Sequence, residues 1–111
     1  MAQNFQNELS NNITLLASPT VLRAATTTND AIIGVRCTNT SGVSVDITVY
    51  VKNTSTNYYI IKDAPIPTGG SLELIDGGSK VVLQTGDSVE AYASAATSVD
   101  IILSVVDAIS S

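Results

Sequence analysis

The strictest alternation of hydrophobic and polar residues in this chain runs from Val45 to Lys52. Successive side chains of a β-strand point to opposite faces, so the alternation predicts a strand with one buried and one solvated face, which is typical of antiparallel sheets. The positions predicted to face inward are Val45, Ile47, Val49 and Val51, and those predicted to face outward are Asp46, Thr48, Tyr50 and Lys52.

Other short apolar runs recur about every 8 to 12 residues, separated by turns rich in Gly, Asn, Asp and Pro. No segment shows the 3.6-residue period of an amphipathic helix. We therefore predict an all-β fold: an antiparallel β-sandwich of the jelly-roll or immunoglobulin-like type, with a short extended N-terminal arm. The predicted strands are 12–16, 20–25, 31–39, 43–53, 57–63, 72–75, 80–84, 89–94 and 99–106, with Leu74, Val89, Ile101 and Leu103 also predicted to be buried.

Turn residues make more specific predictions about strand pairing. The polar turn at 53–57 predicts a hairpin between the strands on either side of it. The Asp-Gly-Gly turn at 76–78 predicts a second hairpin that joins 72–75 to 80–84. Pro65 and Pro67 cannot donate ladder hydrogen bonds, so they predict a corner between sheets or a sheet edge.

The segment 31–39 reads as a central strand. Cys37 is the single cysteine of the chain, and in a strand it is predicted to be a small buried side chain instead of a reactive thiol. Simple alternation predicts one face made of Ile33, Val35 and Cys37 and another made of Ile32, Gly34, Arg36 and Thr38.

Residues 1–10 are polar, rich in Gln and Asn, and lack a hydrophobic period. They predict an arm that is either flexible or docked on a partner, with Phe5 and Leu9 as its anchors. The remaining residues, 11–111, are predicted to form one β-sandwich domain, because a chain of this length can build a single modest core.

Charge narrows the class of partners. Ten acidic and five basic residues give a formal net charge of −5, and the basic residues are scattered. We therefore expect no direct binding of nucleic acid or of an anionic membrane surface, both of which require clustered Lys and Arg. The first residues do not resemble a signal peptide, and no apolar run approaches the roughly 20 residues that span a bilayer. The chain is expected to be made in a cytoplasm.

The residues that usually carry catalysis are missing. Without His and with one Cys, the chain offers neither the commonest general base nor a zinc ligand set. No Ser-x-x-Lys pair and no dense calcium loop occurs. We expect no catalytic residue, no cofactor and no metal. Any two carboxylates, for example two of Asp63, Glu73, Asp87 and Glu90, could meet in space as the catalytic pair of a glycosidase. Positions on solvated strand faces and in turn caps are favoured for these side chains.

Several segments in a fixed order resemble the small β-sandwich structural proteins of tailed-bacteriophage virions. The resemblance covers roughly residues 31 to 107 and consists of a "K-D-x-P-x-P" corner, a "S-L-E-L" strand, a "K-x-V-L-x-x-G-D" turn and an "A-S-A" segment before the last strand. In this chain the segments are 59–67 (YIIKDAPIP), 71–74 (SLEL), 80–87 (KVVLQTGD) and 93–100 (ASAATSVD). It implies a non-enzymatic virion component and supplies no catalytic residues.

The expected function is a capsid decoration (cement) protein that binds the capsid lattice as an oligomer, with a trimer favoured by the resemblance. An alternative is a neck, tail or fibre accessory protein of the virion. A further alternative is a carbohydrate-binding module that uses an outward-facing tyrosine and carboxylates. Expected partners are other virion proteins, and the expected location is the virion, after synthesis in the host bacterial cytoplasm. The candidate protein-contact residues are Phe5, Leu9, Pro65, Ile66 and Pro67.

Overall fold

The computed structural model describes residues 4–11, 13, 19–25, 29–73, 81–95 and 98–110, with the backbone alone described at 4–6 and 107–110. Every regular element in these ranges is a β-strand, and none of their segments is a helix able to cross a membrane. The strands are β1 (Asn4–Ser10), β2 (Thr20–Arg23), β3 (Asn29–Asn39), β4 (Val45–Asn53), β5 (Thr56–Ile66), β6 (Ser71–Glu73), β7 (Val81–Leu83), β8 (Asp87–Ala93) and β9 (Val99–Ser110).

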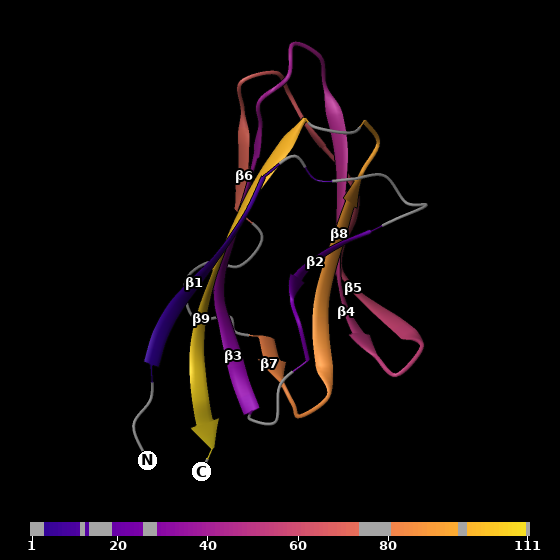
Figure 1. The fold of residues 1–111 in the computed structure, drawn as a ribbon. Coiled ribbons are helices and arrows are strands. Elements are labelled where there is room, and N and C mark those ends of the chain that lie inside the picture. Colours follow the sequence, from indigo (N-terminus) through magenta and orange to yellow (C-terminus); the bar gives the residue numbers. More distant parts are fainter. Residues whose placement is uncertain are drawn as a thin grey trace.

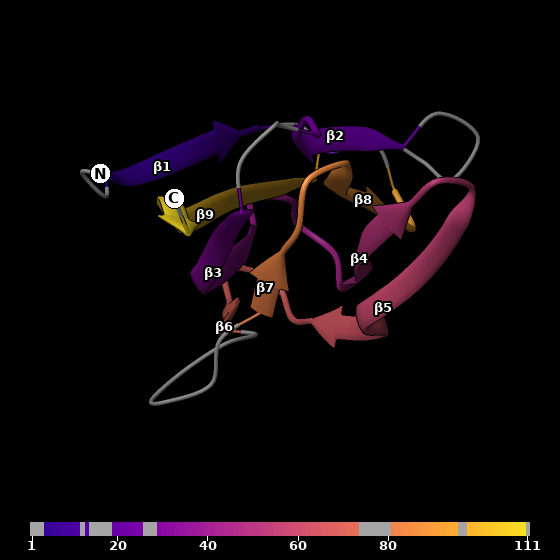
Figure 2. The same ribbon diagram turned by 90° about the horizontal axis from the view of Figure 1, so that it is seen from below.

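The strands form two antiparallel sheets that face each other, as Figure 1 and Figure 2 show. Sheet A has the order β1-β9-β3-β6, with β7 also pairing with β3, and sheet B has the order β2-β8-β4-β5. From β1 to β4 the chain changes sheet at every connection, so most neighbours in a sheet are distant in sequence. The predicted antiparallel β-sandwich is confirmed, and this connectivity is that of a jelly roll.

Two short strands occupy the far edge of sheet A. β6 lies opposite residues 36–38 of β3, and β7 lies opposite residues 30–32. Both run antiparallel to β3 and therefore parallel to each other, so the predicted hairpin between them is wrong. β3 is 11 residues long, and its edge accepts both as successive segments of one interrupted strand. The other predicted hairpin is present, since β4 and β5 pair from Val45 to the turn after Asn53.

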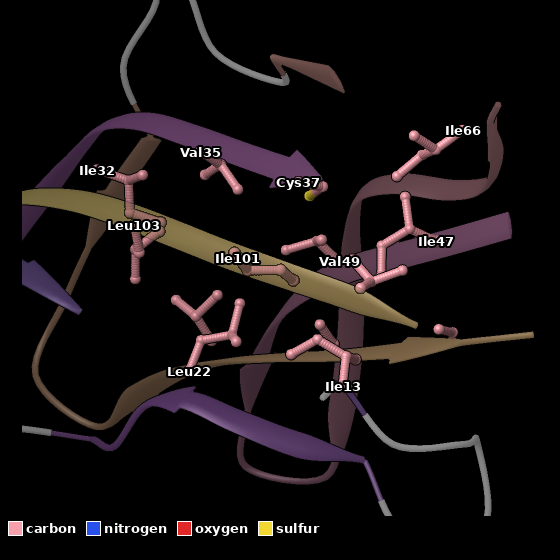
Figure 3. Packing of buried hydrophobic residues seen from close by; sticks show 14 of the residues in the cluster. Ile13, Leu22, Ile32, Val35, Cys37, Ile47, Val49, Ile66, Ile101 and Leu103 are labelled. Atoms are coloured by element: carbon pink, nitrogen blue, oxygen red, sulfur yellow. The ribbon is translucent and has the colours of Figure 1, made fainter. Parts of the chain in front are cut away.

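The core between the sheets is aliphatic, and its side chains come from both sheets (Figure 3). Among the predicted core residues, Val51 is only partly buried, because it lies near the end of β4 opposite the exposed Tyr58. Leu74 lies outside the described residues. The predicted core residues that are buried are Val45, Ile47, Val49, Val89, Ile101 and Leu103.

A bulge in β3 changes which of its residues face the core. The register with β9 shifts between Ile32 and Gly34, so one extra residue is inserted there. Ile32 is buried, as are Val35 and Cys37, whereas Ile33 is half-exposed. The prediction that Ile33 faces the core is wrong, because an inserted residue reverses the alternation on one side of it.

Residues 4–10 of the N-terminal arm are extended and form β1, and residues 1–3 lie outside the described residues. β1 pairs with β9 over its whole length, from Asn4 opposite Asp107 to Ser10 opposite Ile101. This part of the arm is therefore the edge strand of sheet A. Just beyond it, Ile13 donates its backbone N–H to the carbonyl oxygen of Val99 (3.0 Å) and its side chain enters the core.

Candidate interaction surfaces

The carboxylates that could have formed a catalytic pair instead bond to neighbouring strands and turns. Glu73 lies on β6 of sheet A, whereas Asp63 lies on β5 and Asp87 and Glu90 lie on β8 of sheet B. No group of three or more His, Cys, Asp or Glu side chains that could hold a metal ion occurs in the described part of the chain. The contacts are Thr48 Oγ1 to Asp63 Oδ1 (3.3 Å), Arg36 Nε to Glu73 Oε1 (2.7 Å), Asn53 Nδ2 to Asp87 Oδ1 (2.5 Å) and Tyr50 Oη to Glu90 Oε1 (2.7 Å).

Cys37 is buried, as predicted, on the core side of β3. Burial, and to a lesser extent the negative charge of Glu73, raise the pKa of its thiol to about 12. Since the thiolate is the reactive form, a pKa this high makes Cys37 an inert packing residue.

Tyrosine side chains gather on the outer face of sheet B. Tyr50 lies opposite Tyr59 on β5, with the ring centroids 5.6 Å apart at 61°, and its centroid is 6.2 Å from that of Tyr92 at 57°. Lys62 Nζ lies 4.9 Å from the centroid of the Tyr59 ring. These neighbours bury Tyr50, although alternation predicts a solvated position. Burial, and then the hydrogen bond to Glu90, raise the pKa of the Tyr50 hydroxyl. The inclined rings brace the sheet and do not form a flat stacking platform.

The predicted contact residues at the end of β5 divide between surface and core. Pro65 and Pro67 are exposed, but the Ile66 side chain is completely buried, so the structure corrects its assignment as a contact residue. The carbonyl oxygen of Ile66 accepts a hydrogen bond from Asn39 Nδ2 (2.9 Å), and that of Pro67 accepts one from the Gly70 N–H (2.9 Å). The corner is therefore held by internal bonds and buries its central residue.

The other two predicted contact residues, Phe5 and Leu9, lie on β1. The backbone of Phe5 is opposite Val106, and the Phe5 side chain is outside the described residues. Leu9 is 69% exposed and lies opposite Ile102 of β9, which is itself 45% exposed. Both line an open hollow of about 390 Å³ beside Ser10 and Asp100. The exposure of Ile102 could have been predicted from the sequence. Ile101 and Leu103 on either side of it were predicted to be buried, and alternate residues of a strand face opposite sides.

A largely buried cluster of charges ties β1 and β3 of sheet A to β2 of sheet B. Arg23 of β2 donates from Nη1 to Glu8 Oε2 of β1 (2.5 Å) and from Nη2 to Asp30 Oδ2 of β3 (3.1 Å). Arg23 and Asp30 are 6% and 1% exposed. Sequence reasoning treated Arg23 only as one of the scattered basic residues, because nothing in the local pattern marks a charge as buried.

The sheet edges differ in how they are protected against pairing with another chain. The edge strand β5 carries two register shifts against β4, a left-handed backbone at Asp63 (φ 52°), Lys62 and Pro65, which are typical protective devices. β2 has four residues and a register shift, and β6 and β7 have three residues each. β1 has seven residues, no register shift, no proline and no lysine.

Comparisons with known proteins support the fold alone. No protein-family model and no curated protein matches the chain. Among solved structures, the chain is similar to a chain of the Bacillus endospore appendages, which form a novel family of disulfide-linked pili. The similarity has a TM-score of 0.54 and 14% sequence identity, and it covers 98% of this chain and 88% of the other.

Proposed function

We propose that this chain is a non-enzymatic structural protein that acts as a subunit of a larger protein assembly. The observation that carries the proposal is the regular edge of β1, which pairs with no second strand in the described part of the chain. Leu9 on β1 and Ile102 on the next strand, β9, are exposed. Regular sheet edges with exposed apolar residues are ready sites for pairing with another chain. The carboxylates described above support the absence of catalysis, because each is used in a structural contact.

The proposed assembly is the virion of a tailed phage, with the chain as a capsid decoration protein or, alternatively, as a neck, tail or fibre accessory protein. This part rests on the resemblance over residues 31 to 107. The corner segment of that resemblance has structural roles here: Asp63 forms the bulge held by Thr48, and Ile66 fills the core. The motif therefore supports a shared fold more strongly than a particular position in the particle.

A second candidate is a subunit of a filamentous surface appendage. It is favoured by the fold similarity to the endospore appendage subunit, which extends over nearly the whole chain. A disulfide link of the kind described for those pili could not be made through Cys37 in this fold, because the thiol is buried in the core. Subunits of an appendage built from this chain would therefore have to be joined by non-covalent contacts, since Cys37 is its single cysteine.

A carbohydrate-binding module receives less support from the geometry. Sugar rings stack on exposed aromatic faces, but Tyr50 is buried, and Lys62 lies over the ring of Tyr59. The inclination of 61° between the Tyr50 and Tyr59 rings also leaves no shared plane.

Immunogold electron microscopy tests the proposed function. Antibodies raised against the purified protein would be applied to phage particles and to cell-surface filaments from bacteria that carry the gene, with a strain deleted for the gene as the control. Regular labelling over capsids supports a decoration protein, and labelling at one end of the particle or on its tail supports the accessory alternative. Labelling along filaments favours the appendage. If neither particles nor filaments are labelled, the proposal of a structural subunit is overturned.

A further inference from the structure

The free edge of β1 is suited to one particular partner, a second copy of β1. We infer that β1 pairs antiparallel with β1 of another subunit, so that sheet A continues across the interface of a two-fold dimer. This inference rests on the proposed function, because it names the contact through which the structural subunits associate.

The backbone of β1 provides the pairing groups. All seven residues are in unbroken register with β9, and β1 forms no backbone ladder with any other described strand. β2 of sheet B lies near the end of β1 and contacts it through the Arg23–Glu8 ion pair (Figure 2). In an antiparallel edge strand, about half of the backbone N–H and C=O groups point away from the sheet. These groups form a regular ladder for one more strand.

The other edges of the same molecule are poor partners for that ladder. β5 is interrupted by bulges and Pro65, and β2, β6 and β7 are short. A head-to-tail contact would need β1 to pair with one of them. Pairing of β1 with β1 of a second copy uses the longest regular edge of the described strands twice, which makes an isologous two-fold contact.

Charge also permits two copies to meet at this edge. The chain has a net charge of −5, which disfavours contact between identical surfaces. β1 carries one carboxylate, Glu8, and Glu8 is already paired with the buried Arg23 of its own subunit. The edge is therefore close to neutral, in contrast to the molecule as a whole.

The sequence of β1 selects a register centred on Asn7. With Asn7 opposite Asn7 of the second copy, all seven residues pair, and Leu9 lies opposite Phe5 in both halves of the contact. Glu8 then lies opposite Gln6, which can donate to a carboxylate. A register centred on Glu8 would pair fewer residues and place two carboxylates directly opposite each other, which is unfavourable. A two-fold contact gives a dimer or an even-numbered assembly, in place of the trimer that the resemblance favours.

Cysteine cross-linking of the full-length protein tests the register. Asn7 is exposed and lies on the two-fold axis, so Asn7→Cys places two thiols opposite each other. Opposed Cα atoms in antiparallel strands are about 4.5–5.5 Å apart, within the range of a disulfide. Asn57→Cys is the matched control, because Asn57 is an exposed asparagine on β5. Cys37 does not compete, since it is buried.

Under mild oxidation we expect a covalent dimer from Asn7→Cys and none from Asn57→Cys at the same concentration. In sedimentation velocity, Asn7→Lys should weaken the dimer of the wild-type chain by roughly fivefold, because two like charges are opposed, whereas Asn57→Lys should leave it unchanged. Circular dichroism would establish that each variant is folded.

Equal cross-linking of the two cysteine variants, a wild-type chain that stays monomeric at all concentrations, or a trimer insensitive to Asn7→Lys would overturn the inference. The immunogold microscopy described above tests the proposed function independently of the cross-linking. Labelled particles or filaments without an Asn7→Cys cross-link would keep the proposed function and reject the β1 contact. A cross-linked dimer without any labelling would support the contact and reject the assembly role.

Discussion

The buried charge cluster makes the strongest prediction about stability. Replacing Arg23 by Met keeps an unbranched side chain of similar length and removes its positive charge, which lies between Glu8 and Asp30. Asp30 is 1% exposed, so its carboxylate would lose the Arg23 ion pair without gaining contact with water. Breaking a buried ion pair by removing one partner typically costs about 3–5 kcal/mol. Folded domains are stable by only about 5–15 kcal/mol, so a large share of the total would be lost.

Arg36→Met is a matched control within the same chain. Arg36 also pairs with a carboxylate on a neighbouring strand, Glu73, at 2.6 Å, but the two side chains are 57% and 46% exposed. Exposed ion pairs contribute about 0–1 kcal/mol. The same substitution is therefore expected to have a small effect at Arg36 and a large one at Arg23.

Urea unfolding followed by far-ultraviolet circular dichroism measures both variants, with the free energy of unfolding obtained by linear extrapolation. A triple variant, Glu8→Gln with Arg23→Met and Asp30→Asn, should recover part of the loss, since it removes the carboxylates that Arg23 neutralises. If Arg23→Met costs less than about 1 kcal/mol, or no more than Arg36→Met, then the cluster does not hold the strands together and the reasoning is refuted.

Three further outcomes are expected. Val49→Asp should lower the free energy of unfolding by about 4 kcal/mol or more, because it removes a buried side chain and buries a carboxylate; urea unfolding checks this, with the exposed Val43→Asp expected to change it by about 0.5 kcal/mol at most. Burial raises the pKa of Cys37 from 9.0 to about 12, so between these pH values the folded state keeps a proton that the unfolded chain releases. The free energy of unfolding should therefore fall as pH rises above 9.0. Cys37→Ala should reduce that fall, as measured by urea unfolding at pH values below and above 9.0. Tyr50→Phe should cost about 1–2 kcal/mol in thermal unfolding through loss of its hydrogen bond to Glu90 of β8. An effect no larger than that of the exposed Tyr58→Phe would show that this hydrogen bond does not stabilise the fold.

Local pattern was enough for the fold class and for much of the core. The alternation from Val45 to Val51 identifies the inward face of β4, because a strand's two faces are fixed by a period of two residues whatever it pairs with. The same rule does not say which strand lies at the edge of a sheet, so the edge position of the strand that carries Leu9 could not be predicted from it. It also fails at Ile33, where one bulged residue, required by the fit of β3 to β9, reverses the faces.

The partners of each strand were decided by the tertiary structure. β1 pairs with β9 at the other end of the chain, and this pairing makes residues 4–10 the edge of a sheet. Arg23 is buried because carboxylates from β1 and β3 meet it, although each of these residues looks like an ordinary surface charge in sequence. Ile66 is in the core because the corner after β5 turns its side chain inward, so a proline-flanked position that suggested a contact is a packing position. Alternation is a local property and is legible in the sequence, whereas burial of a charge and exposure of an edge depend on segments that meet only when the chain has folded.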